Sequence, residues 1–204
     1  MTDAADVKGK ESYHHGDLRA ALLVAGEAVL AETGVEGFSL RQVAKRVGVS
    51  HSAPAHHFGD TQGLLSALAA EGFRRFLAAM LARQAEAPDD PREQMLAQAV
   101  GYLDFAESAP ALFRLMFGSD RIWPSTPELA EAGRAAYRNL TDGVARLRGL
   151  APDDPAALPD VVACWSVAHG FAHLVIGRRM EPVQGLSRDE REALLRQAVA
   201  KVLD

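Results

Sequence analysis

The stretch SLRQVAKRVGVSHSAPAHHFGDTQGLL, residues 39–65, decides the fold, because its pattern indicates two short helices joined by a glycine turn. Its first half carries apolar residues at helical spacing, namely Leu40, Val43, Ala44 and Val47. Ser39 precedes them as an N-cap, with Gln42 three residues on as its capping-box partner. Gly48 ends this helix, since glycine takes a left-handed conformation at little steric cost. The pattern predicts a DNA-binding helix-turn-helix.

The second half of the stretch follows the turn and is polar on its outer side. Ser50 is expected to cap the second helix. Pro54 then falls in the first helical turn, where most backbone N–H groups have no acceptor within the helix. No carboxylate occurs between residues 39 and 59, so phosphate groups are favoured at this surface. The alternative is that this is only the solvated face of a small helix pair.

The predicted DNA-binding surface has two kinds of contact. Base edges are assigned to His51, Ser52 and His56. Phosphate or positioning contacts are assigned to Tyr13, Arg41, Lys45, Arg46 and Thr61, and Gln42, Ser50 and His57 complete the surface. The three cations of the first helix are expected to have no acid beside them. Since imidazoles gain protons between about pH 8 and pH 6, we expect the affinity for DNA to rise as the pH falls.

Residues 16–76 resemble the N-terminal domain of the TetR/AcrR family of transcriptional regulators. The likeness rests on Asp17-Leu18-Arg19, Glu32-Thr33-Gly34, Gly37-Phe38-Ser39-Leu40, Gly48-Val49-Ser50, and His57-Phe58 followed by Leu64-Leu65. The resemblance implies a homodimer that binds a palindromic double-stranded operator and responds to a small-molecule effector. It implies a regulator, interpreted here as a repressor.

Two departures from the family pattern concern anchoring to phosphates. Family members often carry an aromatic residue two places before the His-Phe pair, where this chain has Ala55. They also commonly have lysine near the start of the fourth helix, where this chain has Thr61 or Gln62. An alternative therefore stays open, in which the protein binds or sequesters a small molecule and its DNA-binding head is degenerate.

Length and composition are typical of a globular protein with a substantial core. The chain has 204 residues, of which 48% are hydrophobic and 24% are charged, with a formal net charge of -5. Charges interrupt the apolar runs before the roughly 20 residues that a membrane span needs, and the N-terminus lacks a signal peptide's apolar centre. We expect a cytoplasmic protein with no membrane segment. The single cysteine, Cys164, excludes an intramolecular disulfide and is expected to be buried.

The rest of the chain is also predicted to be helical, so the fold class is all-α. Helices are expected over residues 61 to about 86, 91 to about 107, and 109–117, from Pro127 onward, over 161–176, and after Ser187. We assign residues 1–60 to an N-terminal arm and a three-helix helix-turn-helix domain. Residues 61–204 are assigned to a helical domain for effector binding and dimerisation.

The segment from Trp165 to Phe171, WSVAHGF, resembles the Trp/His-Gly (WHG) signature of one group of TetR-type C-terminal domains. Trp165 and His169 are four residues apart and share a helix face, so both can line one cavity. The predicted ligand-binding set is Tyr102, Phe105, Phe113, Met116, Tyr137, Trp165 and His169. An apolar or aromatic effector is expected, and the alternative is that these residues form an ordinary core.

The last two helices form the predicted dimer surface. Residues 161–176 are apolar around almost the whole circumference, which indicates cover on more than one side. Two such helices from each protomer can build a four-helix bundle. The residues assigned to the interface are Phe171, Val175, Leu195, Val199 and Val202, and the alternative is that both helices pack only within one protomer.

Metal binding and catalysis are the remaining alternatives for this chain. His169 and His173 have the i, i+4 spacing of a metal-chelating pair, and Cys164 is a third candidate ligand. Gly170 stands where a zinc-protease helix would carry its glutamate. No phosphate-binding glycine loop or nucleophile elbow is present in the sequence. We therefore expect no cofactor, no metal and no catalytic residue.

Overall fold

The computed structural model describes residues 15–122 and 126–204, with the side chains of residues 15–17 left out. Over these residues the chain forms ten α-helices, two short 3-10 helices and no strand, which confirms the all-α prediction. The helices are α1 (His15–Thr33), α2 (Leu40–Val47), α3 (Ala53–Phe58), α4 (Thr61–Glu86), α5 (Pro91–Ser108), α6 (Pro110–Gly118), η1 (Asp120–Ile122), α7 (Pro127–Arg148), η2 (Pro155–Ala157), α8 (Leu158–Ile176), α9 (Glu181–Gln184) and α10 (Arg188–Leu203).

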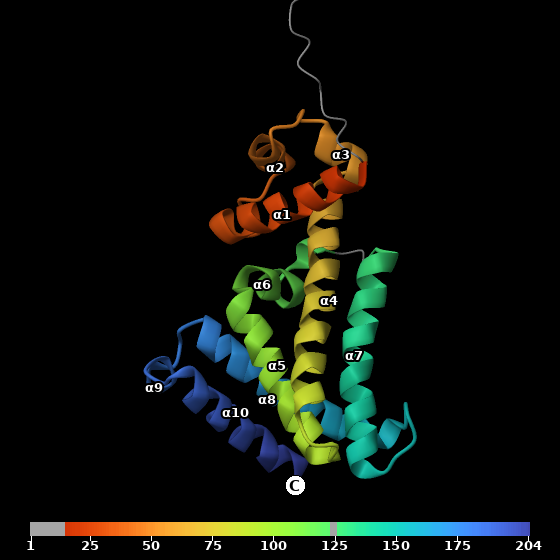
Figure 1. The fold of residues 1–204 in the computed structure, drawn as a ribbon, viewed down its shortest axis with the longest axis vertical. Helices are drawn as coiled ribbons and strands as arrows, with labels where there is room; N and C mark the ends of the chain where they lie inside the picture. The colour runs from red at the N-terminus through yellow and green to blue at the C-terminus, as the bar shows by residue number, and fades with distance from the viewer. Residues whose placement is uncertain (1–14, 123–125) are drawn as a thin grey trace, which may run out of the picture.

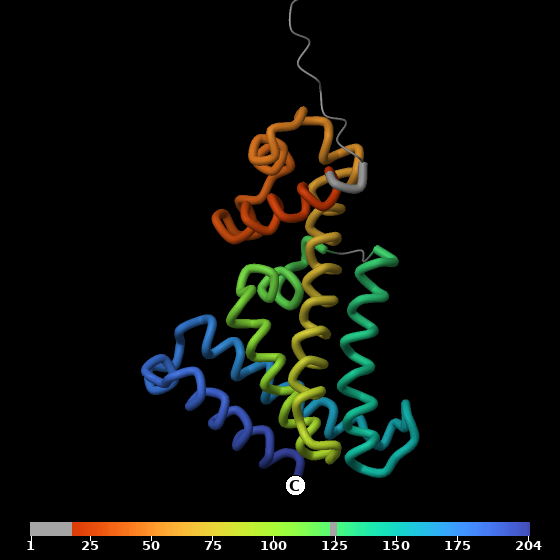
Figure 2. Tube along the Cα trace, in the orientation of Figure 1, coloured from red at the N-terminus to blue at the C-terminus, as the bar shows by residue number. Residues whose placement is uncertain are grey.

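Helix α4 is the axis of the molecule (Figure 1). The head, defined as α1–α3, lies at the N-terminal end of α4, and α5 and α7 flank the rest of that helix. The path of the chain in Figure 2 shows α8 and α10 lying beyond α5, at the end opposite the head. The buried residues form one continuous core from Leu22 in α1 to Leu203 in α10. A change in the position of α4 can therefore reach both ends of the molecule.

The predicted helix boundaries are set by local capping, and the structure confirms several of them. The Ser39 Oγ accepts a hydrogen bond from the Gln42 backbone N–H at 3.4 Å. Asp90 caps α5 in the same way, with Pro91 in the first turn. Ser187 and Glu190 form a reciprocal capping box at the start of α10. These starts follow from neighbouring residues alone, because each cap binds backbone groups within three positions.

Two glycines allow helices to approach closely. A Cβ on Gly101 of α5 would lie 2.5 Å from the Ala79 carbonyl oxygen and the Met80 Cα of α4. A Cβ on Gly72 of α4 would lie 2.5 Å from the Met116 Sδ of α6. A larger residue at Gly101 would meet the backbone of α4 and push α5 away from it, whereas a larger residue at Gly72 would require the flexible Met116 side chain to move.

The start of α3 corrects one prediction. Ser50 does not cap this helix, because α3 begins at Ala53 and its N-cap is Ser52, whose side chain makes no capping hydrogen bond. The Ser50 Oγ instead lies 3.2 Å from the Ser52 Oγ. Pro54 occupies the first turn, as predicted. The turn after Gly48 is thus longer than the sequence pattern indicated.

Candidate functional site

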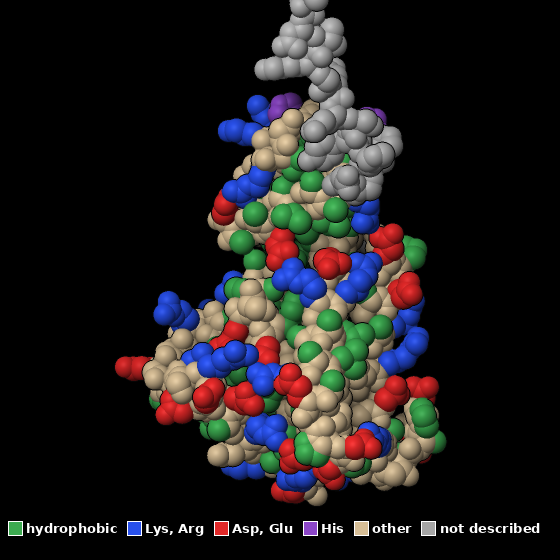
Figure 3. Space-filling model, viewed as in Figure 1, with side chains coloured by type: hydrophobic (Ala, Val, Ile, Leu, Met, Phe, Trp, Pro, Cys, Tyr) green, Lys and Arg blue, Asp and Glu red, His purple; other side chains and the backbone are tan. Residues whose placement is uncertain are grey.

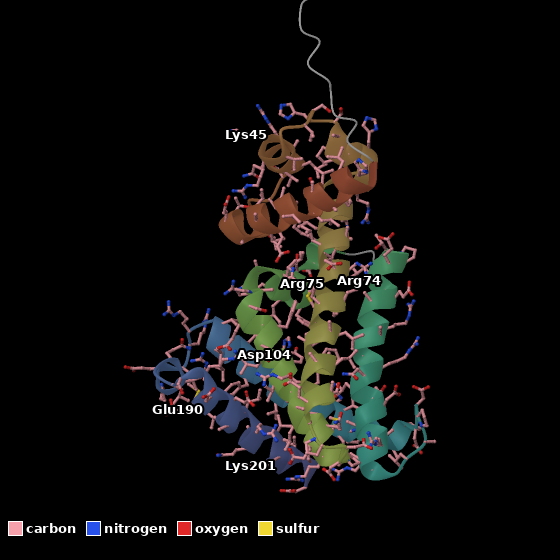
Figure 4. The ribbon with its side chains drawn as sticks, viewed as in Figure 1. Lys45, Arg74, Arg75, Asp104, Glu190 and Lys201 are labelled. Atoms are coloured by element: carbon pink, nitrogen blue, oxygen red, sulfur yellow. The ribbon has the colours of Figure 1, made fainter. Side chains whose placement is uncertain are left out.

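The candidate DNA-binding surface lies at the outer end of the head. Most of the predicted residues that the structure describes are exposed there: Arg41, Gln42, Lys45, Arg46, Ser50, His51, Ser52 and His56. His57 and Thr61 are half-buried. Figure 3 shows Lys, Arg and His side chains at this end, and Figure 4 shows Lys45 at its outer edge. Tyr13 lies outside the described residues.

The cations of this surface are not equivalent, which corrects the expectation that none has an acid beside it. Arg46 donates a hydrogen bond of 2.6 Å to the Glu32 carboxylate at the end of α1. Among the described residues, no carboxylate lies within 4.0 Å of the charged atoms of Arg41 or Lys45. Glu32 is remote in sequence from the turn, so the spacing within residues 39–65 could not reveal the pair. Arg41 and Lys45 are the freer cations.

Backbone geometry fixes how the second helix is presented. Gly48 has a φ of 78°, the left-handed conformation predicted for the end of α2, and its N–H reaches the Ala44 carbonyl oxygen. At the other end of α3, a Cβ on Gly63 would lie only 1.9 Å from the Phe58 carbonyl oxygen. Asp60 caps α4 by accepting a hydrogen bond of 2.8 Å from the Gly63 N–H. Glycine is required at both positions, so α3 is held tightly between α2 and α4.

The body is defined as α4–α10. A cavity of about 370 Å³ lies in it, between α4, α5, α7 and α8. Its lining is mostly apolar and rich in aromatic rings: Phe73, Phe76, Tyr102, Phe117, Tyr137 and Trp165. Tyr137 and Trp165 stand at the mouth, where they are 41% and 39% exposed, with ring centroids 5.9 Å apart. This volume falls within the range of small-molecule sites.

The structure brings together only part of the predicted ligand-binding set. Tyr102, Tyr137 and Trp165 line the cavity, whereas Phe105, Phe113, Met116 and His169 do not. Phe113 is fully buried and lies against the ring of Phe117, with centroids 5.0 Å apart. These four residues pack behind the wall, that is, behind the residues that line the cavity. The wall itself uses Phe73 and Phe76, whose place in the apolar stripe of α4 was a signal that the sequence analysis did not use.

The WHG segment supports the wall through a hydrogen bond. The Tyr102 hydroxyl and the His169 Nδ1 are 2.6 Å apart. Burial raises the pKa of the Tyr102 phenol above its usual value, against a smaller opposing effect of a hydrogen bond with Trp165. Burial also lowers the pKa of His169, and the neighbouring His173 adds to this effect. The pair is therefore neutral near pH 7, and it holds two segments of the wall together.

Gln98 is a buried polar residue of the cavity lining. It is 5% exposed, it lines the cavity, and its Oε1 has no hydrogen-bond partner. The other buried oxygen without a partner among the described residues, Ser66 Oγ, does not line the cavity. Sequence analysis missed Gln98, although a glutamine within the apolar run MLAQAVGYL was a visible signal. An unpaired acceptor here is costly unless a bound group satisfies it.

The predicted dimer residues are mostly inside the protomer. Leu195 and Val199 are 0% and 1% exposed, and Phe171 and Val175 are also buried, so these four contribute almost no surface to a partner. Val202 is half-buried. They face the core that α8 and α10 share with α5. The apolar residues that remain exposed on the two helices are Leu158, Val162, Trp165, Leu174 and Leu194.

Helix α8 is unusual in composition. Residues Pro155–Ile176 are long and apolar enough to cross a membrane by length and composition alone, yet only 28% of their most apolar stretch is buried. Because the core helices of soluble proteins can be equally long and apolar, this is weak support for a membrane span.

Over the part of the chain that the structure describes, no group of three or more His, Cys, Asp or Glu side chains is placed to hold a metal ion. His169 Nδ1 is already engaged by Tyr102.

Polar contacts join the head to the body. Arg75 of α4 forms an ion pair of 2.7 Å with Glu27 of α1, and Arg121 of η1 donates a hydrogen bond to the Val35 carbonyl oxygen. Figure 4 places Arg74 and Arg75 at this junction.

A second polar cluster lies within the body, where Asp104 receives hydrogen bonds from Arg83 at 2.6 Å and Arg188 at 2.8 Å. Burial would raise the pKa of Asp104, but these hydrogen bonds lower it below its usual value.

Comparisons with known proteins agree with this arrangement. Residues 22–68 match the family described as bacterial regulatory proteins, tetR family, and residues 95–202 match the tetracyclin repressor-like, C-terminal domain. The chain belongs to the TetR family of transcriptional regulators. The family resemblance and the helix-turn-helix prediction are thereby confirmed.

Individual relatives support the TetR assignment over most of the chain. The HTH-type transcriptional regulator BetI of Stenotrophomonas maltophilia (strain R551-3) is 29% identical over 163 residues, which cover 78% of each chain. A solved structure of a protein with unknown function from Rhodococcus sp. RHA1 is 34% identical, with a TM-score of 0.78 over 94% of this chain and 98% of that one. The TetR family regulator PfmR of Thermus thermophilus, 20% identical with a TM-score of 0.62 over 89% and 96%, shares the fold.

Proposed function

We propose that this TetR-family regulator is a homodimeric repressor, and that a small molecule in the α4–α5–α7–α8 cavity releases it from a palindromic operator. The observation that carries the proposal is that one helix serves both ends. Phe73, Phe76 and Met80 of α4 line the cavity, while the N-terminus of α4 follows α3 directly. A helix of 26 residues is about 39 Å long, so a small shift at its middle is transmitted to the head.

Release requires the ligand to favour one position of the head over another. The head shares the buried apolar core with α4, as Leu22 and Leu68 show, and the polar contacts at the edge of this junction are few, as in the Arg75–Glu27 ion pair and the hydrogen bond from Arg121 to the Val35 carbonyl oxygen. Such contacts re-form at low cost when helices shift. A ligand that moves α4 or α6 therefore changes the separation of two heads, which must be about 34–36 Å to fit successive major grooves.

The DNA contacts of the proposal follow the sequence prediction, with one change of emphasis. His51, Ser52 and His56 are assigned to base edges, and Arg41, Lys45 and Thr61 to phosphates. Arg46 is given a secondary role because of its pairing with Glu32. Tyr13 keeps its predicted role as a positioning residue. The domain division at residue 60 is likewise retained, with α4 assigned to the effector domain.

The proposed dimer interface is the exposed apolar surface of α8 and α10, which replaces the residues predicted from sequence. Val162 and Leu174, 54% and 39% exposed, lie on α8, and Leu194, 37% exposed, lies on α10. Their transfer from water into a four-helix bundle supplies the driving force for association. This explains why so apolar a helix is so little covered within one protomer.

The experiment combines oligomeric state with DNA binding. Analytical ultracentrifugation of the full chain should give a dimer, and duplexes from the DNA flanking its gene should shift in a gel, with a sequence preference and a steep loss of affinity with salt. Val162→Glu should give a monomer that binds this DNA poorly. Leu81→Glu, the same change at a 48% exposed residue of α4, should leave a dimer.

A second candidate function is a ligand-binding protein with a degenerate head. Ala55 and the missing lysine at the start of α4 favour it, because both replace groups that the family resemblance places on phosphates. A dimer that fails to shift any of these duplexes at low salt, yet binds a ligand in the cavity, would establish this alternative and reject the repressor.

A further inference from the structure

We propose that the effector is an elongated aromatic molecule with a hydrogen-bond donor at one end and a negative charge at the other, of the hydroxyaryl-alkanoate class. This inference deepens the proposed function and rests on it for the role of the cavity. Three features of the cavity define the class: a buried acceptor, an aromatic wall and a cation at the mouth.

The buried acceptor is the Gln98 Oε1. It is buried, it belongs to a residue that lines the cavity, and it has no hydrogen-bond partner. A Cβ on Gly143 of α7 would lie 3.4 Å from this oxygen and 2.6 Å from the Met95 Sδ, so the amide lies close to α7 and beside Met95. An acceptor in such surroundings selects a ligand that carries a donor, because any other ligand leaves it unpaired. A hydroxyl group satisfies it.

The charged group of the lining is Arg134 of α7. It is exposed, and no carboxylate among the described residues pairs with it. No described Asp or Glu lines the cavity. An anion is therefore favoured over a cation at the mouth.

The two anchors stand well apart along the cavity. Arg134 precedes Gly143 by nine residues on one helix, which at 1.5 Å per residue is about 13.5 Å along its axis. The reach of the arginine side chain shortens this span, and the ligand must cover the remainder. Tyr137 lies between these two positions on α7, and the lining also includes Tyr102 and Trp165, so three rings are present to suit an aromatic body.

The cavity volume bounds the size of the ligand. A volume of about 370 Å³ corresponds to about a dozen waters at their share of liquid volume. A ring with a short acidic tail and one hydroxyl has about as many non-hydrogen atoms. We therefore use 3-(4-hydroxyphenyl)propanoate as the probe, since its phenol and carboxylate lie at opposite ends.

The experiment is calorimetric titration of the full-length dimer with a matched series of probes. 3-(4-Hydroxyphenyl)propanoate should bind about tenfold more tightly than 3-phenylpropanoate, which lacks the donor. It should bind about threefold more tightly than the uncharged 3-(4-hydroxyphenyl)propan-1-ol, because the charge at the mouth is partly screened by solvent. Tyramine, which carries the opposite charge, should bind most weakly of the phenols.

Two variants test the anchors separately. Gln98→Leu should remove the preference for the hydroxyl while still binding 3-phenylpropanoate, which also shows that the variant is folded. Arg134→Gln should remove the preference for the carboxylate, and Arg138→Gln, an exposed arginine one turn further along α7 that does not line the cavity, should retain it. Failure of every probe to bind, tighter binding of tyramine, or an unchanged hydroxyl preference in Gln98→Leu would overturn the inference.

The same preparation separates this inference from the proposed function. A protein that shifts its flanking DNA but binds none of the probes retains the repressor proposal and loses the ligand class. A protein that binds the probes as predicted but no DNA retains the ligand class and loses the repressor proposal. Release of DNA by 3-(4-hydroxyphenyl)propanoate in the wild type, but not in Gln98→Leu, supports both.

Discussion

The salt dependence of DNA binding offers a quantitative test of the head. Each phosphate that a cation neutralises contributes about 0.9 to the slope of log affinity against log salt. Lys45 has no ion-pair partner among the described residues, so Lys45→Ala in both protomers of a dimer should reduce the slope by about 1.8. Arg46 is paired with Glu32 at 2.6 Å, so Arg46→Ala should reduce it by less.

The Glu32–Arg46 pair makes this a double-mutant test. The two side chains are 59% and 38% exposed, and such surface pairs contribute at most about 1 kcal/mol, so Glu32→Gln should not unfold the head. Glu32→Gln should free Arg46 to contact phosphate and so make the slope of log affinity against log salt steeper. In the Glu32→Gln background, Arg46→Ala should then reduce the slope by the full value of about 1.8. Fluorescence anisotropy with a labelled flanking duplex from about 50 to 200 mM salt measures the slopes of the wild type, Glu32→Gln, Arg46→Ala and the double variant.

A matched control removes the effect of net charge. Arg138→Ala makes the same change in charge on α7, at the far side of the junction from the head, and should leave the slope unaltered. If Arg46→Ala reduced the slope equally with and without Glu32, the idea that this carboxylate competes with phosphate would be refuted. A loss of slope in Arg138→Ala would show that total charge, not position, governs binding.

Further predictions concern stability and pH. Gly101→Ala should lower the free energy of unfolding by about 1–3 kcal/mol or more in urea titrations, since its Cβ meets the backbone of α4, whereas Gly133→Ala, which meets nothing within 4 Å, should not destabilise. The free energy of unfolding should fall as the pH drops below about 6.5, because the lowered pKa of His169 means that the unfolded chain binds the extra proton first; His169→Gln should flatten this dependence between pH 7 and 5.

The sequence by itself determined the fold class and most helix boundaries. Capping is local, so Ser39, Asp90 and Ser187 mark the starts of α2, α5 and α10 from residues within three positions. The left-handed Gly48 follows from the same local chemistry. The predicted start of α3 was wrong because two serines competed for one cap, and only the path of the chain after Gly48 decides between them.

Tertiary structure alone decided which faces of the helices meet. A 3.6-residue period marks Leu195 and Val199 as an apolar stripe, but it does not say whether the same protomer or a partner covers that stripe. Likewise, Phe113 and Phe76 are both aromatic residues on helices, and only the packing of α6 against α4 puts the first behind the cavity wall and the second in it. The Glu32–Arg46 pair joins the end of α1 to the end of α2. Contacts of this kind depend on how whole helices cross, which no short window of sequence contains.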